Sequence, residues 1–146
     1  MRETGDRADE LASRVFLGWH HMATVDRLDE AQLDDLPFGA IQLDAEGRVV
    51  RYNATEASIS GRTKAEVIGR DFFHEVAPCT NVQQFAGRFR EGVRAEMLNE
   101  VFPYRFDFRM QPTEVWIRLY YSHDSRTAWV FVTRRELDDS GEEQAV

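Results

Sequence analysis

Residues 102–110 read Phe-Pro-Tyr-Arg-Phe-Asp-Phe-Arg-Met, the clearest alternation of apolar and polar side chains in the sequence. Every second side chain of a β-strand points to the same face, which groups Phe102, Tyr104, Phe106, Phe108 and Met110. Pro103 lies near the start of the stretch, where a strand tolerates the missing N–H group. The stretch therefore predicts a strand whose aromatic face covers a core.

Four further strands are expected around this one. Downstream, 115–121 alternates in the same way, and 127–133 is an almost unbroken apolar run. A strand that is apolar on both faces is typical of the middle of a covered sheet, so we expect 127–133 to be central. Upstream, 38–43 and 48–52 flank a turn that ends in Gly47, which predicts a hairpin. Together the strands indicate an α+β fold with a five-stranded antiparallel sheet.

Helices are expected between the hairpin and the last three strands. Thr63 and Glu66 have the spacing of a capping box, and Gly69 follows, so a short helix is predicted over 63–68. Farther on, apolar residues recur at every fourth position, at Phe85, Phe89, Val93 and Met97. This spacing predicts an amphipathic helix of about three turns.

The two ends of the chain differ from this core. Apolar residues recur at helical spacing within 10–23, and a second helical turn over 31–36 ends at Pro37. Residues 136–146 are acidic, and we expect them to be disordered. We therefore divide the chain into a helical cap over 1–35, which covers the sheet face opposite the other helices, a core over 36–135, and an acidic tail over 136–146.

Composition narrows the class of protein. A chain of 146 residues fits one domain, and its net charge of −8 argues against nucleic acid as a partner. The single cysteine cannot form an internal disulfide, and no Cys/His cluster has zinc spacing. No stretch approaches the ~20 apolar residues of a membrane span, and the N-terminus lacks a signal pattern. We expect a cytoplasmic protein that does not bind metals or membranes.

The single cysteine, Cys79, stands at the end of the apolar stretch 72–80. Pro78 disfavours a helical conformation at Ala77, so Cys79 is expected at a helix break or at the start of the next helix. A helix N-terminus favours a thiolate, which can hold a group covalently. From this stretch alone, however, a buried cysteine without a chemical role is favoured over a functional one.

Three polar residues, Tyr52, Glu56 and Ser60, are spaced four apart after the second expected strand. On a helix they would share one side and could meet one ligand oxygen, although the spacing alone favours three unrelated polar residues at the end of a strand. The chain has no glycine-rich phosphate loop and no zinc-protease motif. Cys79 with His74 as its base lacks an orienting third group, so we do not expect an enzyme.

Several motifs together resemble the photoactive yellow protein family of PAS domains, over roughly residues 33–135. The pattern that follows the hairpin is generic to PAS domains, whereas Pro78-Cys79-Thr80 in combination with Tyr52, Glu56 and Arg62 is much more specific. The other matching segments are Phe38–Asp44, Tyr52-Asn53-Ala54, Gly61-Arg62, Val67-Ile68-Gly69, Phe72-Phe73, Glu91-Gly92-Val93, Phe106-Asp107, Pro112-Thr113 and Trp129–Val132.

The resemblance implies a bacterial blue-light photoreceptor, a signalling protein whose 36–135 core is a PAS domain. Its cofactor would be p-coumaric acid (4-hydroxycinnamic acid), bound to Cys79 as a thioester. Tyr52 and Glu56 would hydrogen-bond the chromophore phenolate. The resemblance also implies further chromophore-binding residues, namely Ser60, Arg62, Thr80, Phe106 and Met110.

The resemblance also implies a mechanism. Light isomerises the chromophore from trans to cis, and Glu56 transfers its proton to the phenolate. The buried carboxylate that remains is costly, and we expect it to loosen the N-terminal cap. The expected partner is a downstream signalling protein, and the expected state is a monomer or a weak dimer.

Residues 1–32 match the family poorly, and Ser60 stands where threonine is usual, which predicts at most a modest colour shift. The alternative is a PAS sensor for another ligand, for example haem bound through His74. A flavin is not expected, because Cys79 is followed by Thr-Asn-Val and not by the flavin-sensor motif.

Overall fold

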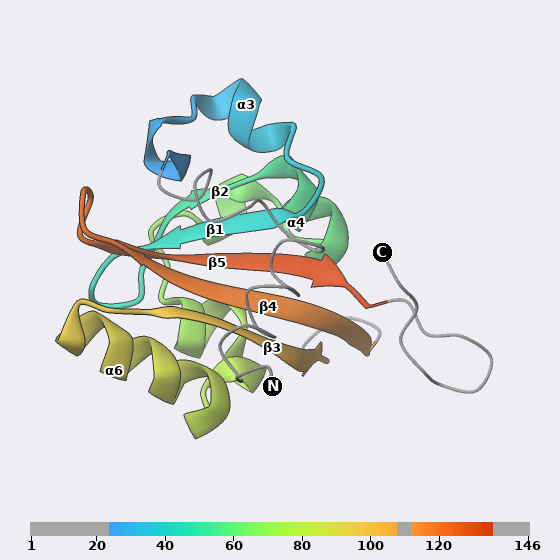
Figure 1. Cartoon of the computed structure of the whole chain (residues 1–146). Coiled ribbons are helices and arrows are strands. Elements are labelled where there is room, and N and C mark those ends of the chain that lie inside the picture. The colour runs from blue at the N-terminus through green and yellow to red at the C-terminus, as the bar shows by residue number, and fades with distance from the viewer. Residues whose placement is uncertain (1–23, 108–111, 136–146) are drawn as a thin grey trace, which may run out of the picture.

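The structure, a computed structural model, describes residues 24–107 and 112–135 (Figure 1). The expected helix at 10–23, the residues Phe108 and Met110, and the acidic tail 136–146 lie outside the described residues. Within the two described ranges, no helix has the length and apolar character that crossing a membrane requires.

A five-stranded antiparallel sheet forms the centre of the domain, as predicted. In spatial order its strands are β2 (Val49–Tyr52), β1 (Gly39–Leu43), β5 (Thr127–Arg134), β4 (Thr113–Ser122) and β3 (Asn99–Phe106). The chain thus forms one hairpin, crosses over through helices, and returns as a three-stranded meander. The central position predicted for 127–133 is confirmed, since β5 lies between β1 and β4.

The central strand β5 is buried on both faces. Val130 and Val132 belong to a large apolar cluster beneath the helices, whereas Trp129 and Phe131 belong to a smaller cluster on the opposite face. The rings of Trp129 and Phe131 stack, with their centroids 5.8 Å apart and their planes within 6°. The apolar run in the sequence is therefore explained by two cores, one on each side of the sheet.

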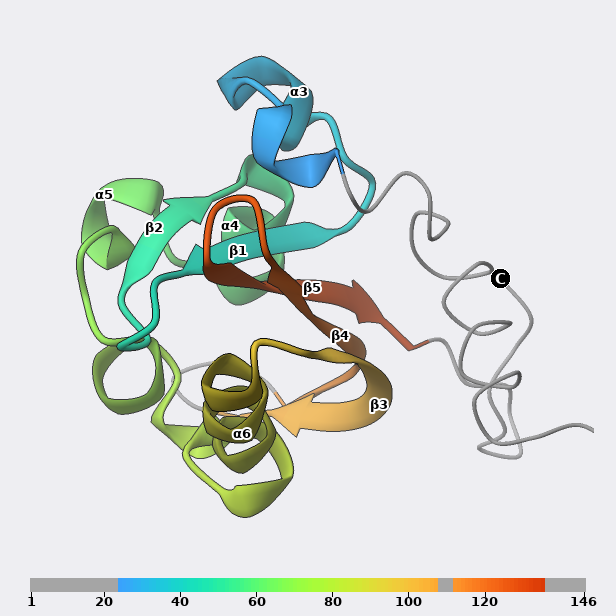
Figure 2. The same ribbon diagram turned by 60° about the vertical axis from the view of Figure 1, so that its left-hand side comes forward.

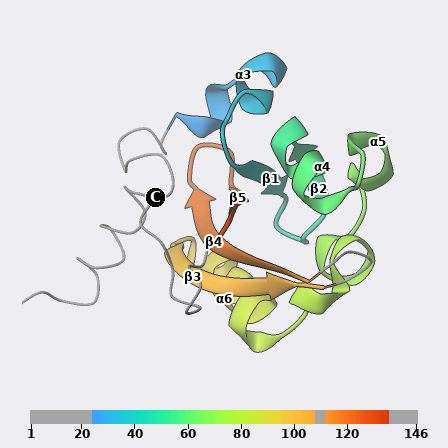
Figure 3. The ribbon, with the colours of Figure 1, turned by 90° about the vertical axis from the view of Figure 1, so that its right-hand side faces the viewer.

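Short helices and turns cover the face with the large cluster (Figures 2 and 3). These elements are α4 (Ala54–Ser60), α5 (Lys64–Val67), η2 (Phe72–Val76), η3 (Pro78–Thr80), η4 (Gln83–Gly87) and α6 (Arg88–Ala95). Figure 2 shows α4 and α5 along the β1–β2 half and α6 toward the other end of the sheet. The predicted capping box is present at the start of α5, because Thr63 and Glu66 exchange side-chain to backbone hydrogen bonds.

One residue of the predicted apolar helix face is misplaced. Phe85 and Phe89 are buried as expected, but Met97 is 77 % exposed. The cause is Glu96, whose φ of 54° places it in the left-handed region and ends α6. The four-residue spacing is therefore broken one residue before Met97.

The smaller cluster is covered by the described end of the N-terminal cap. Turn η1 (Val25–Arg27) and helix α3 (Glu30–Asp34) contribute the buried side chains Val25 and Leu33. Asp29 and Gln32 form a capping box that starts α3. The predicted arrangement, with other helices on one face and the cap on the other, is therefore present in this part of the chain.

Asp26 fastens this cap to the tip of the β4–β5 hairpin. Its Oδ1 accepts hydrogen bonds from Trp129 Nε1 at 2.8 Å and from Ser125 Oγ at 3.1 Å. Its Oδ2 accepts a further bond from the hydroxyl of Ser122. Trp129 is fully buried, so Asp26 gives its indole N–H a partner that water cannot easily replace.

Replacing Asp26 with alanine should therefore destabilise the domain. Asp26→Ala leaves a buried indole N–H unpaired, and we expect the free energy of unfolding to fall by about 1–3 kcal/mol, measured by denaturant titration. Glu46→Ala, which removes an exposed carboxylate from the β1–β2 turn, is the matched control and should change little. Equal stabilities for the two variants would contradict this role of Asp26.

Candidate functional site

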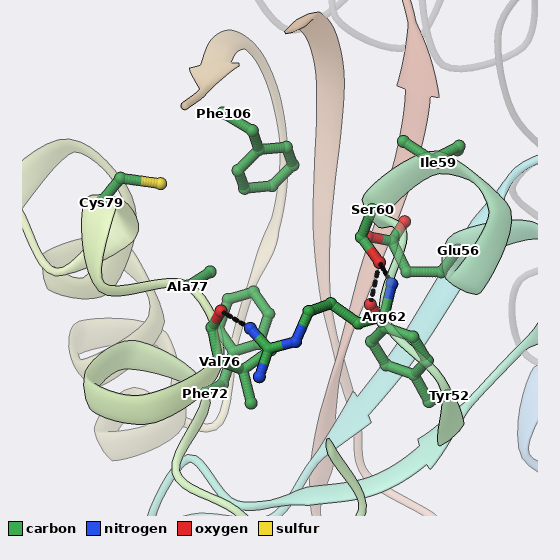
Figure 4. A pocket seen from close by; sticks show the side chains of 10 residues that line it. All are labelled: Tyr52, Glu56, Ile59, Ser60, Arg62, Phe72, Val76, Ala77, Cys79 and Phe106. Carbon is green, nitrogen blue, oxygen red and sulfur yellow. Dashed lines mark hydrogen bonds between the residues drawn. The ribbon is translucent and has the colours of Figure 1, made fainter. Parts of the chain in front are cut away.

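One cavity lies between helix α4 and the turns η2 and η3 (Figure 4). Its volume is about 30 Å³. Figure 4 shows polar groups of α4 on one side of the cavity and the cysteine turn on the other. The lining residues are Tyr52, Glu56, Ile59, Ser60, Arg62, Phe72, Val76, Ala77, Cys79 and Phe106.

A single strand-to-helix junction brings the polar side chains together. Tyr52 is the last residue of β2, Asn53 caps α4, and Glu56 and Ser60 follow on that helix. Gly61 ends the helix with a φ of 76°, in the left-handed region that favours glycine. Of the three residues spaced four apart, Glu56 and Ser60 therefore lie on one side of α4 that faces the cavity, and Tyr52 reaches the same cavity from the end of β2.

Asn53 fixes this junction in the fold. Its Oδ1 accepts from the N–H groups of Ala40 and Glu56, both at 2.9 Å. Its Nδ2 donates to the carbonyl oxygens of Leu33 at 2.8 Å and Phe38 at 3.1 Å. The side chain is fully buried. One amide group therefore connects α4, β1 and the cap.

Tyr52 and Ser60 form a hydroxyl pair at one side of the cavity. Their oxygens are 2.7 Å apart, and Ser60 Oγ also accepts the N–H of Arg62 at 3.1 Å. Burial, and then the nearby Glu56 carboxyl, raise the pKa of the Tyr52 phenol above its ordinary value. Tyr52 therefore keeps its proton at neutral pH and can act as a donor.

Glu56 is a buried acid beside this pair. Its side chain is 4 % exposed, and Oε1 has no hydrogen-bond partner among the described residues. Burial raises the pKa of the carboxyl to about 8, with a smaller opposing effect from the charge of Arg134, so Glu56 is protonated at neutral pH. A Cβ atom on Gly39 would lie 2.1 Å from Oε1, which means that glycine is required there for this position of Glu56.

Arg62 extends across the cavity in Figure 4, from the Ser60 side toward Val76. Its Nη1 donates to the carbonyl oxygen of Val76 at 2.9 Å, and its Nε lies 3.5 Å from Oε2 of Glu66. A ligand that enters the cavity would therefore meet the Arg62 side chain.

Cys79 lies at the other side of the cavity, at the helix break that the sequence predicts. Asp71 caps η2 by accepting the N–H groups of Phe73 and His74, both at 3.0 Å. Pro78 then opens η3, which carries Cys79 as a free, half-buried thiol.

The structure brings together most of the residues that the sequence singled out. Six of them line the cavity: Tyr52, Glu56, Ser60, Arg62, Cys79 and Phe106. Thr80 is fully buried but does not line it, and its hydroxyl donates to the carbonyl oxygen of Ala77 at 2.7 Å. Met110 lies outside the described residues.

His74 is not part of the site. Its exposed ring lies 3.1 Å from Oδ1 of Asp71 and does not line the cavity, so the ligand that the haem alternative requires lies outside this cavity. Within 24–107 and 112–135, no group of three or more His, Cys, Asp and Glu could hold a metal. Sequence reasoning missed the apolar lining, because such side chains resemble any other core residues: Ile59, Phe72, Val76 and Ala77.

The raised pKa of Glu56 predicts how stability depends on pH in the apoprotein. The folded state keeps the proton up to about pH 8, whereas a glutamate in the unfolded chain loses it near the ordinary pKa of 4.5. The folded state therefore binds more protons between these values, and the free energy of unfolding should fall as the pH rises from 5 toward 8, by up to about 1.4 kcal/mol per pH unit.

Denaturant titrations at several pH values measure this slope, and Glu56→Gln should make it less steep by removing the contribution of Glu56. Glu66→Gln is the matched control. Hydrogen bonds with Thr63 lower the pKa of Glu66, so its contribution changes only below the tested range. A slope in Glu56→Gln as steep as that of the wild type would contradict the assignment.

Comparison with known sequences agrees with the resemblance. A family model described as the PAS fold matches residues 27–142. The photoactive yellow protein of Rhodothalassium salexigens is 48 % identical over 107 residues, which cover 73 % of this chain and 86 % of that protein. The photoactive yellow protein of Halochromatium salexigens is 47 % identical over 107 residues, with the same coverage of both chains.

Comparison of folds gives the same result. The crystal structure of the photoactive yellow protein domain of the sensor histidine kinase Ppr from Rhodospirillum centenum superposes with a TM-score of 0.73 at 47 % sequence identity. The match covers 76 % of this chain and 97 % of that domain. The fold, the sequence and the cavity therefore agree, and the chain belongs to the photoactive yellow protein family of light-sensing PAS domains.

Proposed function

We propose that this protein is a blue-light photoreceptor that carries p-coumaric acid as a thioester on Cys79 and has no enzymatic activity of its own. The observation that carries the proposal is the pairing of two groups across one cavity. A free thiol lies at one side, and a buried, protonated carboxyl lies beside the Tyr52–Ser60 hydroxyl pair at the other. An acyl group with a phenolic oxygen at its far end is complementary to both.

The Arg62 side chain extends across the cavity that such a group would enter, so Arg62 would have to turn aside. Its hydrogen bond to Val76 and its ion pair with the half-exposed Glu66 hold it weakly. When bound, the p-coumaroyl group would supply blue-light absorption, a trans-to-cis isomerisation and a phenolate oxygen.

Tyr52 and Glu56 would stabilise that oxygen. A buried phenolate is costly unless it is hydrogen-bonded, and both side chains carry a proton at neutral pH. Tyr52 resists ionisation because burial raises its pKa, so it would remain a donor throughout. Glu56 has a pKa of about 8, closer to neutrality, so Glu56 is the group that would give up its proton in response to light.

Ionised Glu56 would disturb the cap through the contacts of α4. Asn53 bonds both the N–H of Glu56 and the carbonyl oxygen of Leu33 in the cap. Thr55 Oγ1 donates to the carbonyl oxygen of Leu36 at 2.7 Å. A carboxylate without a matching charge in this interior is unfavourable, and movement of α4 that exposes it to water would strain these links and loosen the cap.

The signal would then pass to another protein. The relative from Rhodospirillum centenum is a domain of a sensor histidine kinase. We propose that this chain likewise acts on a signalling protein, through surfaces that the loosened cap uncovers.

Attachment of the chromophore tests the first part of the proposal. Activated p-coumaric acid should turn the apoprotein yellow and add one coumaroyl mass, because the thiol is free and faces the cavity. Absorption spectra and intact-protein mass spectrometry measure both effects.

Cys79→Ala should abolish the colour and the added mass. His74→Ala is the matched control within the same segment, and it should leave both unchanged. A wild-type protein that stays colourless and unmodified would refute the proposal.

Loss of the transferable proton tests the second part. In the chromophore-loaded protein, light should increase amide hydrogen exchange over residues 24–36, and Glu56→Gln should reduce this increase severalfold, because an amide cannot donate a proton and become charged. Exchange measured in light and in darkness by mass spectrometry gives the ratio. Glu66→Gln should respond as the wild type does, and an undiminished response in Glu56→Gln would exclude Glu56 as the trigger.

A further inference from the structure

Tyr104 connects the cysteine turn to the sheet. It lies on β3, the edge strand that pairs with β4, and its hydroxyl donates to the carbonyl oxygen of Cys79 at 2.6 Å. Tyr104 does not line the cavity, so it holds the cysteine from outside.

The turn otherwise bonds mainly to itself. The N–H and the hydroxyl of Thr80 both bind the carbonyl oxygen of Ala77, at 2.9 and 2.7 Å, and Asn81 N–H binds that of Pro78 at 3.1 Å. In the part of the chain that the structure describes, the bond from Tyr104 is the only hydrogen bond between residues 77–82 and the sheet.

The phenol of Tyr104 is itself well fixed. Its ring meets Phe85 edge-on at 5.2 Å and Phe106 at 5.9 Å. Burial, and then the nearby Cys79, raise the pKa of Tyr104, so the hydroxyl stays a donor. Phe106 also lines the cavity, so the Tyr104 ring lies next to one of the side chains that form its wall.

We propose that Tyr104 is a positioning residue for Cys79: its hydroxyl fixes the peptide plane after the cysteine and thereby aims the thiol into the cavity. The direction of a side chain is set by the peptide planes on both sides of its Cα. Here the preceding plane is constrained by Pro78 and by the η3 turn, and the following plane is constrained by Tyr104. The inference rests on the proposed function, in which this thiol takes up the acyl group.

The first test needs no chromophore. Because Cys79 is the only cysteine, growth on cysteine carrying ¹³C at its carbonyl carbon labels one carbonyl group in the protein. Tyr104→Phe keeps the ring and removes the donor, and the labelled resonance should shift toward that of a carbonyl without a hydrogen bond. Tyr120→Phe, which removes a hydroxyl near the opposite face, is the control and should leave it in place. An unchanged resonance in Tyr104→Phe would overturn the inference.

The second test separates the direction in which the Cys79 thiol points from its accessibility to a small reagent. Tyr104→Phe should slow acylation of Cys79 by a p-coumaroyl thioester by about three- to tenfold, as expected for one lost hydrogen bond, and should change alkylation by the small reagent iodoacetamide less than twofold. Equal slowing of both reactions, or of neither, would overturn the inference. If the wild type is not acylated at all, the proposed function fails, and the carbonyl resonance still decides whether Tyr104 holds Cys79.

Discussion

The burial of the Glu56 carboxyl is the constraint on which the rest of this domain depends. An acid kept from water remains protonated because its charged form is too costly, and its pKa of about 8 reflects this. Gly39 leaves room for its oxygen against β1, and the Tyr52–Ser60 pair fills the adjacent space. The surroundings therefore favour the protonated form of Glu56, and ionisation of this side chain would affect each of these neighbours.

Asn53 links the helix that carries Glu56 to the cap, so a change in the protonation of Glu56 can reach the cap. A single buried amide bonds to α4, to β1 and to the cap residue Leu33. Asp34 of α3 adds a second connection, because it accepts the N–H of Ala54 at 2.7 Å and lies 2.8 Å from Nζ of Lys64. The first turn of α4 and the cap are thus one hydrogen-bonded unit, and neither can move without breaking bonds of the other.

Local rules predicted most of the fold and only part of the site. The strands and the Thr63 capping box follow from spacing within a few residues, and the position of β5 follows from its apolar run. The prediction that Met97 lies on the buried helix face was wrong, because the left-handed conformation of Glu96 that ends α6 leaves no periodic pattern in the sequence. The spacing of Tyr52, Glu56 and Ser60 could be read from the sequence. Which side of α4 faces Cys79, however, depends on the order of the strands in the sheet. The contacts of Asp26 and Tyr104 join segments far apart in the chain, and no pattern in the sequence marks them.

The two sides of the cavity belong to different parts of the molecule. This difference determines which side would move when a bound ligand changes shape. Under the proposed function, the Cys79 side would form a covalent bond, and Tyr104 ties its turn to β3. The Glu56 side would form hydrogen bonds, each worth about 1.5–3 kcal/mol for a charged acceptor, and this side belongs to a unit that includes the cap. A ligand that spans both sides and changes shape would keep its covalent end and break its hydrogen-bonded end. The response would therefore start at α4 and reach the cap through Asn53, while the β3–β4 end of the sheet stays in place.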